Sequence, residues 1–261
     1  AGLDYSLYQN GLFRTYTYPP LFNSANLSIR SFVNRGQEKV IGSRDGLFYI
    51  NEATGVVKSF VKPVLTSDLI LTISFYQGEY YIGTYGGGMM VLNPGTLSLK
   101  YFAQGDTELF QKGHIFCVKP DAKGNLWIGT SQGLFCYNGQ TKQIKHFTSA
   151  NSQLPEGNVY EVSFDSTGKG WIATETGMCI YDPASQSLRS NVFPEGFVHR
   201  DKVRTIYEDA GHNLYFIREK GSLFTSTLTM DRFQNRSIFS TLPDLSLIHI
   251  SEHTRRVVIS Y

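Results

Sequence analysis

Similar segments rich in apolar residues recur along this chain at a nearly constant interval, and the residue types in each segment follow one order. An aromatic residue and an isoleucine precede a small residue, a threonine, a glycine turn, several apolar residues and finally Asn or Asp. This order is visible in Glu79–Asn93, Gly124–Asn138 and Gly170–Asp182. Two markers share a period of 41 to 46 residues: the small-residue position at Gly42, Gly83, Gly129, Ala173 and Ile217, and the turn glycine at Gly46, Gly88, Gly133, Gly177 and Gly221. Such a period predicts a repeat architecture.

Each repeat divides into four short apolar runs. In the third copy the runs are Ile115–Lys119, Leu126–Thr130, Leu134–Tyr137 and Ile144–Phe147. Runs this short, rich in β-branched and aromatic residues and bounded by turn residues, predict strands rather than helices. The segments Asp121–Gly124 and Asp165–Gly168 have the residue types of tight hairpin connections, and Asn93-Pro94-Gly95 and Asp182-Pro183 predict further turns.

The four runs of a repeat differ in their hydrophobic pattern. The first run is almost continuously apolar, as in Leu69–Ile73, which is typical of a strand buried on both faces. The last run alternates, as in Ile144–Phe147, which indicates an outer strand. Four antiparallel strands graded from buried to exposed, with this period, predict an all-β fold for which no helix is needed: a β-propeller of four-stranded antiparallel blades. We expect second strands near Val40–Ser43, Tyr81–Thr84, Leu126–Thr130, Trp171–Thr174 and Leu214–Ile217.

The pattern predicts an incomplete propeller, with five recognisable blades plus part of another. Gly11-Leu12-Phe13 matches the Gly-Leu-Phe opening of third strands in later copies, so we expect the chain to enter in mid-blade and the natural protein to be longer. Leu245–Glu252 reads LSLIHISE, which resembles a translated sequencing adapter, and the repeat stops there. We therefore expect a partial propeller over 1–244 and a non-native tail over 245–261. The alternative for the tail is a divergent native strand.

Composition limits the possible functions. The chain has 261 residues, 41% of them hydrophobic, and a formal net charge of +2, which gives no footprint of a nucleic-acid-binding protein. No apolar run reaches the length that spans a bilayer. Cys117, Cys136 and Cys179 are odd in number and lie in predicted strands, so we expect buried free thiols and no disulfide framework.

Three motifs are better explained by the repeat than by chemistry. Trp127 and Trp171 occupy the repeated second-strand slot, so we predict core residues rather than platforms for a sugar. Gly86-Gly87-Gly88 precedes an apolar strand and not a helix, which favours a widened turn over a phosphate loop. Thr167–Trp171 resembles the docking motif of quinone-cofactor propellers but occurs once. The histidines lack metal-ligand spacing, and we predict no cofactor, no metal and no catalytic residue.

The phrase Asn125–Thr130, followed by Gly133-Leu134 and Tyr137-Asn138, resembles the two-component regulator propeller repeat, as do Trp171–Thr174 and, more loosely, Tyr81–Thr84. The resemblance covers about Gly11–Asp244. It implies the periplasmic sensor region of a hybrid two-component regulator of the type found in Bacteroidetes, which senses glycan fragments and signals to a histidine kinase. The implied partners are an oligosaccharide ligand, the missing blades, the sandwich domain and kinase of the same polypeptide, and a second copy in a homodimer; nucleic acid is not implied.

A candidate ligand surface follows from propeller geometry. The connection between blades lies on the same side as the turn between second and third strands. These turns and connections vary between copies while the strands repeat, which is how a scaffold presents a specific surface. The alternative is that the loops vary because nothing constrains them. The candidate ligand-binding residues are Arg44, Tyr85, His114, Gln132, Glu175, Arg200 and Lys220.

Three functions fit these patterns. The first is a ligand-sensing module without enzymatic activity in this chain. The second is a propeller enzyme, such as a lyase or hydrolase, and the third is a structural interaction scaffold. A His or Tyr clustered with carboxylates on the candidate surface would favour an enzyme, whereas an aromatic and polar surface without such a cluster would favour a sensor.

Overall fold

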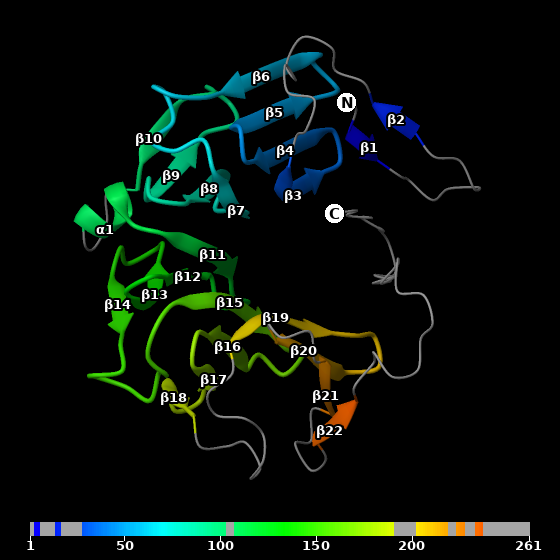
Figure 1. Ribbon diagram of the computed structural model, residues 1–261. Coiled ribbons are helices and arrows are strands. Elements are labelled where there is room, and N and C mark those ends of the chain that lie inside the picture. Colours follow the sequence, from blue (N-terminus) through cyan, green and yellow to red (C-terminus); the bar gives the residue numbers. More distant parts are fainter. Residues whose placement is uncertain are drawn as a thin grey trace.

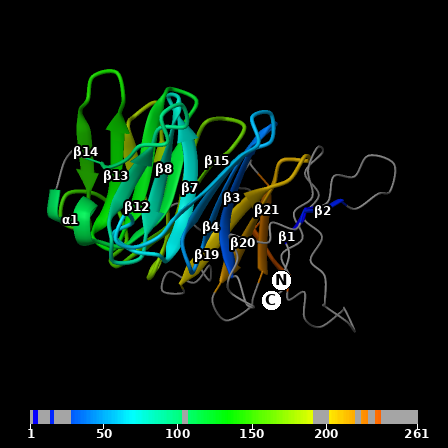
Figure 2. The same ribbon diagram turned by 90° about the horizontal axis from the view of Figure 1, so that it is seen from above.

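The computed structural model (Figure 1) describes residues 3–5, 14–16, 28–102, 107–190, 202–218, 223–227 and 233–236. These residues form five four-stranded antiparallel sheets and one two-stranded sheet, β1 (Leu3–Tyr5) with β2 (Arg14–Tyr16). The five large sheets follow one another around an arc, with the first strand of each toward the centre (Figure 1). In Figure 2 the inner strands are seen from the side, at their full length. Figure 1 therefore looks roughly along the axis around which the blades are arranged. The predicted propeller fold is confirmed.

The strands of each blade pair in sequence order, from the innermost to the outermost. Blade 1 contains β3 (Ile29–Arg35), β4 (Glu38–Ser43), β5 (Leu47–Asn51) and β6 (Val56–Phe60). Blade 2 contains β7 (Ile70–Tyr76), β8 (Glu79–Thr84), β9 (Met89–Leu92) and β10 (Leu99–Tyr101). Blade 3 contains β11 (Ile115–Pro120), β12 (Asn125–Thr130), β13 (Gly133–Asn138) and β14 (Ile144–Phe147).

The last two blades repeat this arrangement. Blade 4 contains β15 (Val159–Phe164), β16 (Gly170–Thr174), β17 (Gly177–Asp182) and β18 (Ser187–Arg189). Blade 5 contains β19 (Val203–Glu208), β20 (Asn213–Arg218), β21 (Leu223–Thr227) and β22 (Phe233–Arg236). All five predicted second strands are therefore confirmed. Gly11–Phe13 and the predicted tail over 245–261 lie outside the described residues.

The small residue of each repeat makes room for the next blade. A Cβ atom on Gly83 would lie 2.6 Å from Cγ2 of Thr72 and 2.7 Å from Cγ2 of Ile115, the first residue of the next inner strand. A Cβ atom on Gly129 would lie 2.7 Å from the carbonyl oxygen of Val159 in the blade after that. The repeat therefore conserves space for blade-to-blade packing at this position.

The threonine and the final Asn of the repeat stabilise turns. The hydroxyl of Thr84 donates to the carbonyl of Gly88 at 2.9 Å, and Ser43, Thr130 and Thr174 make the same bond in their own blades. Gly88 has φ +71°, a conformation that favours glycine. At the end of the third strand, Oδ1 of Asn93 accepts the N–H groups of Gly95 and Thr96, and Asn51 and Asn138 cap equivalent turns.

The core lies in layers between successive blades. Leu126 and Ile128 of β12 face the layer shared with blade 2, whereas Trp127 of the same strand faces the layer shared with blade 4. Five of the six residues in β4, β8 and β12 are buried, and both faces of β8 and of β12 meet a neighbouring blade. This corrects the prediction that the first strand is the most buried: β3 and β19 keep half-exposed and exposed residues, and no described strand pairs with their inner edge.

One short helix is present beside the strands of the predicted all-β fold. The helix α1 (Thr107–Lys112) lies in the connection between blades 2 and 3. Leu109 and Phe110 are buried in the layer between these blades. The N–H of Gly88 donates to the carbonyl of Gly113 at 2.9 Å, which ties the end of the helix to the predicted widened turn. Burial of an apolar pair in this layer stabilises a helix that its sequence alone would not.

Candidate functional site

The turns between second and third strands lie against the starts of the inner strands. The backbone N–H of the first turn residue donates to the carbonyl of the residue that precedes the inner strand. These bonds join Arg44 to Ser28, Tyr85 to Leu69, Ser131 to His114 and Glu175 to Asn158, at 2.9 to 3.2 Å. In these four blades the predicted common side of turns and connections is confirmed. Arg200 and Lys220 lie outside the described residues.

Two of the predicted site residues are in direct contact. Tyr85, from the turn of blade 2, stacks on His114, which precedes the inner strand of blade 3; the ring centroids are 4.0 Å apart and the rings are inclined by 26°. Tyr85 is 50% exposed, so the outer face of its ring is open to solvent. Nδ1 of His114 is buried and has no hydrogen-bond partner. The pair thus forms a fixed aromatic step on the candidate surface.

The other described candidates occupy separate turns. Arg44 and Gln132 are exposed at their turn tips, and the backbone carbonyl of Gln132 accepts a hydrogen bond from Nε2–H of His146 at 2.8 Å. Oε2 of Glu175 accepts the N–H of Asn158 at 3.3 Å, so this carboxylate stabilises its own loop. Among the described residues, no side-chain hydrogen bond or ion pair joins these three candidates to one another.

Every inner strand carries a β-bulge at the same place. In each blade the pairing between first and second strands shifts after the first residue of the inner strand and leaves one extra residue. Bulges redirect side chains and are frequent beside functional sites. The five bulge residues are Arg30, Leu71, Phe116, Tyr160 and Arg204. We call these five residues, together with Arg44, Tyr85 and His114, the mouth surface.

The mouth surface is continuous over blades 2 to 5. Phe116 lies 6.2 Å from the ring of His114 and meets Tyr160 edge-on at 5.1 Å. The guanidinium carbon of Arg204 lies 4.5 Å from the centroid of the Tyr160 ring, and Nζ of Lys202 lies 5.0 Å from it. Cations at these distances are attracted to the face of an aromatic ring. Aromatic rings from three blades, 2 to 4, therefore lead to a basic group on blade 5.

Sequence reasoning missed the bulge residues, although a signal was present. Each follows the first Ile or Val of an inner strand, and the position recurs with the repeat period, yet it holds Arg, Leu, Phe, Tyr and Arg in turn. The position just before it holds Ile or Val in every copy. A variable position inside a repeated strand is the pattern that could have identified them.

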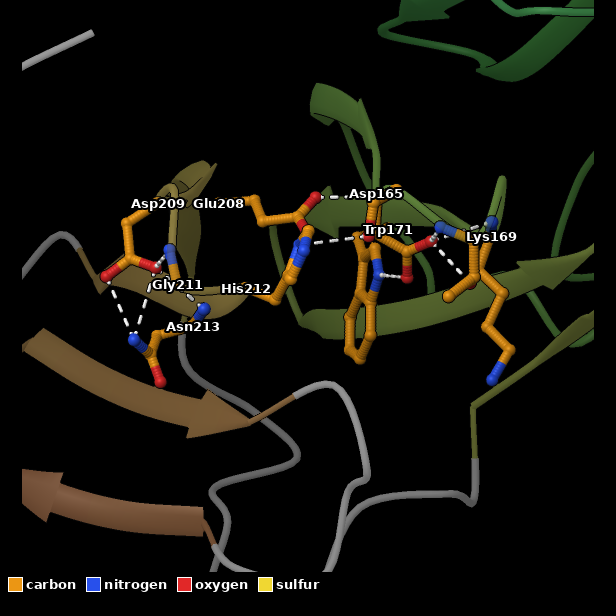
Figure 3. A network of polar contacts seen from close by, with 10 residues as sticks. Asp165, Lys169, Trp171, Glu208, Asp209, Gly211, His212 and Asn213 are labelled. Carbon is orange, nitrogen blue, oxygen red and sulfur yellow. Dashed lines mark hydrogen bonds and ion pairs between the residues drawn. The ribbon is translucent and has the colours of Figure 1, made fainter. Parts of the chain in front are cut away.

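The opposite ends of the blades carry polar contacts that stabilise the fold (Figure 3). Oδ2 of Asp165 accepts the indole N–H of Trp171 at 2.7 Å, and Asp121 binds Trp127 in the same way at 2.9 Å. Both tryptophans are 1% exposed, which confirms that they are core residues. The N–H of Ser166 donates to Oε2 of Glu208 at 2.9 Å and links blades 4 and 5.

In blade 5, Asp209 accepts a hydrogen bond from the hydroxyl of Tyr215, as Asp165 does from the indole of Trp171 in blade 4. Burial acts to raise the pKa of this carboxyl, but bonds from the side chain and backbone of Asn213, from Tyr215 and from the N–H of Gly211 outweigh it and lower the pKa. A lowered pKa means that the carboxylate stabilises the fold above its unfolded pKa and loses this effect as the pH falls through the folded value. Its role is structural.

The three thiols lie in strands, Cys117 in β11, Cys136 in β13 and Cys179 in β17. Cys117 and Cys179 are buried and Cys136 is half-buried. Burial raises the pKa of each thiol, that of Cys136 to about 12. Thiolate, the nucleophilic form, is therefore scarce at neutral pH.

Two further features are absent from the described part of the chain. No group of three or more His, Cys, Asp or Glu side chains is placed there to hold a metal ion. No helix in that part is long and apolar enough to cross a membrane.

Comparison with known proteins agrees with this architecture. Over 97% of its length the chain is similar to the extracellular domain assigned to a hybrid two-component system of B. thetaiotaomicron, with a TM-score of 0.66 and 22% identity. Over 83% it is similar to the extracellular domain assigned to a one-component system of the same organism, with a TM-score of 0.68 and 18% identity. The β-propeller domain of Cps50 (Swd1) from Myceliophteria thermophila gives 0.57 and 11% over 79% of this chain and 72% of its own.

These likenesses define the chain as a β-propeller. Residues 110–132, from α1 into the turn after β12, match the family model of the two component regulator propeller. No curated protein sequence matches the chain significantly. The chain spans 35% and 29% of the two B. thetaiotaomicron structures.

Proposed function

We propose that this chain is the ligand-sensing propeller region of a two-component-type receptor, located in the periplasm, and that it binds an oligosaccharide on the mouth surface. The match over residues 110–132 supports the receptor class, and the B. thetaiotaomicron structures with this fold are extracellular domains of signalling systems. Within this proposal the partners are the remaining blades, a sandwich domain and a histidine kinase of the same polypeptide, with a second copy in a homodimer.

The observation that carries the proposal is the stacked pair of Tyr85 and His114 beside the bulge residues. An aromatic face that is half exposed and held by a second ring can stack on the apolar face of a sugar, while neighbouring polar groups bind its hydroxyls. The strands repeat from blade to blade, whereas the side chains of the mouth surface differ. A scaffold that binds a specific ligand requires this combination.

The mouth surface supports sensing over catalysis. Catalysis of hydrolysis or elimination would need an acid or base held near the substrate. In the described part of the mouth, His114 contacts the rings of Tyr85 and Phe116 and no carboxylate, and the carboxylate of Glu175 is engaged by a backbone N–H.

The test measures binding of a panel of oligosaccharides, prepared from pectin, xylan, arabinan, mannan and chondroitin sulfate, to the full chain by calorimetry. With the ligand found, Tyr85→Ala and Arg44→Ala should each weaken binding by about 1–3 kcal/mol, because truncation removes central contacts. Tyr85→Phe should retain most of the affinity, since it retains the ring.

Matched controls lie on the outer strands. Tyr101 on β10 is 45% exposed, close to the exposure of Tyr85, and Arg189 lies on β18. Tyr101→Ala and Arg189→Ala should leave the affinity unchanged, with circular dichroism showing that all variants fold. No binding by any sugar of the panel, or equal losses in the mouth and control variants, would contradict the proposal.

A further inference from the structure

The turn that carries Tyr85 packs against a neighbouring segment on each side. After Tyr85 it contains three consecutive glycines. A Cβ atom on Gly87 would lie 2.6 Å from Oγ1 of Thr66, in the connection between blades 1 and 2, and a Cβ atom on Gly88 would overlap the carbonyl oxygen of Phe110 in α1. The turn therefore lies between the connection that precedes blade 2 and the helix that follows it.

Two hydroxyl groups of the preceding connection bind the backbone of this turn. Oγ of Ser67 donates to the carbonyl of Tyr85 at 2.8 Å, and Oγ1 of Thr66 donates to the carbonyl of Gly87 at 2.6 Å. The N–H of Tyr85 donates to the carbonyl of Leu69 at 3.0 Å. The peptide groups on both sides of Tyr85 are thus bound to one connection, which restricts the two backbone dihedral angles of this residue.

The corresponding turns of the other blades lack these hydroxyl bonds. Arg44, Ser131 and Glu175 take the place of Tyr85 in blades 1, 3 and 4. In the described part of the chain, no side chain donates a hydrogen bond to the carbonyl of any of these three residues. The additional bonds therefore belong to the turn that carries an exposed aromatic ring.

The ring of Tyr85 itself has few other contacts to hold it. The residue is 50% exposed, and its ring stacks on that of His114. Among the described residues, its hydroxyl has no hydrogen-bond partner. An exposed side chain that rotates freely must be ordered when a ligand binds, and the ordering of one such side chain weakens binding by about 2- to 10-fold. A fixed backbone removes part of this loss before the ligand arrives.

From these contacts we infer that Thr66 and Ser67 are positioning residues of the mouth surface. Their hydroxyls fix the backbone of Tyr85, so that its ring stays on His114 and keeps one face ready for a sugar. This inference rests on the proposed function and assigns two further residues to it. It also gives a reason for the glycine at position 87, which leaves the space through which the hydroxyls reach the turn.

The first measurement needs no ligand. In NMR spectra of the full chain labelled at histidine, His114→Gln identifies the signals of the His114 ring, and Tyr85→Ala gives their position without the stacked ring. Ser67→Ala and Thr66→Val should each move these signals part of the way toward that position. Thr66→Ser keeps the hydroxyl and should leave them unchanged.

The second measurement is the affinity for the tightest-binding oligosaccharide of the panel from pectin, xylan, arabinan, mannan and chondroitin sulfate, by calorimetry. Ser67→Ala and Thr66→Val should each weaken binding by about 2- to 10-fold, because the ring must then be ordered on binding. Thr66→Ser should retain the affinity.

A matched control lies in the inner strand of the same blade. Ser74 is 9% exposed, as Ser67 is, and its hydroxyl also donates to a backbone carbonyl, that of Val118 in blade 3. Ser74→Ala should lower the melting temperature at least as much as Ser67→Ala and leave the affinity and the His114 signals unchanged. Melting curves check that all variants fold.

Each alternative outcome has a distinct meaning. If Tyr85→Ala weakens binding while Ser67→Ala and Thr66→Val keep the affinity or the His114 signals unchanged, this inference is overturned and the proposed function stands. Equal losses of affinity in Ser74→Ala and Ser67→Ala would show that the hydroxyl bonds act through general stability, and would also overturn it. Binding of no sugar of the panel, or full affinity in Tyr85→Ala, would overturn the proposed function and this inference with it.

Discussion

Replacement of Trp127 by alanine is expected to lower the free energy of unfolding by about 3–5 kcal/mol, the range for large aromatic residues in protein cores. The indole is 1% exposed and packs against Phe147, Phe164 and Tyr181, at centroid distances of 6.0, 5.9 and 4.5 Å. Its N–H donates to Asp121 at 2.9 Å. The substitution would therefore open a cavity between blades 3 and 4 and leave a carboxylate with one donor fewer.

Urea denaturation followed by circular dichroism measures this loss. Trp127→Phe keeps most of the ring and removes the hydrogen bond, so it should cost less, about 1.5–3 kcal/mol for a bond to a charged group. Tyr101→Ala, on the exposed outer strand of blade 2, should stay within about 0.5 kcal/mol of the unchanged protein. A loss below 1 kcal/mol for Trp127→Ala would show that the repeated aromatic slot is not a core position.

Gly83→Val tests the packing between blades 2 and 3. The first atom of the new side chain would overlap Cγ2 of Thr72 and of Ile115, and the two methyl groups would extend further into the layer. Overpacking of a core costs about 1–3 kcal/mol and occasionally more. We expect the upper part of this range or beyond, because both contacts are on β-branched side chains with stiff χ1 angles.

The control for Gly83→Val lies in the same blade. Gly95, in the turn after the third strand, has an ordinary φ, and a Cβ atom there would meet only Oδ1 of Asn93, at 3.4 Å. Gly95→Ala should therefore leave the melting temperature nearly unchanged, whereas Gly83→Val should lower it by several degrees. Similar melting temperatures for the two variants would contradict the view that the small residue of the repeat is kept for blade-to-blade contact.

The fold could be predicted from sequence because each blade solves the same packing problem. The small residue at Gly83 and Gly129, the hydroxyl at Thr84 and the cap at Asn93 each answer one local requirement, so they recur with the period and mark the strands. In the part of the chain that the structure describes, the helix α1 has no counterpart in the other copies. The apolar pair Leu109 and Phe110 stabilises it by packing in a layer that two blades share.

The candidate site was predicted only in part, for a related reason. The side of the propeller followed from topology, and the structure confirms it for Arg44, Tyr85, Gln132 and Glu175. The contact between Tyr85 and His114 joins two blades. Hydrophobic patterning does not show how far apart side chains of different blades lie. The bulge residues depend on a shift in backbone pairing, which leaves the apolar pattern of an inner strand unchanged.

Hydrogen exchange of the full chain, with and without the tightest-binding oligosaccharide of the panel, tests the central claim most directly. The account predicts slower exchange in the turns that contain Tyr85 and Gln132 and at the starts of β7, β11 and β15, where the mouth surface lies. Exchange in the opposite hairpins, Asp121–Gly124 and Asp165–Gly168, should not change. Protection confined to those hairpins or to the outer strands would show that the ligand binds elsewhere and would contradict the assignment of the mouth surface as the sensor.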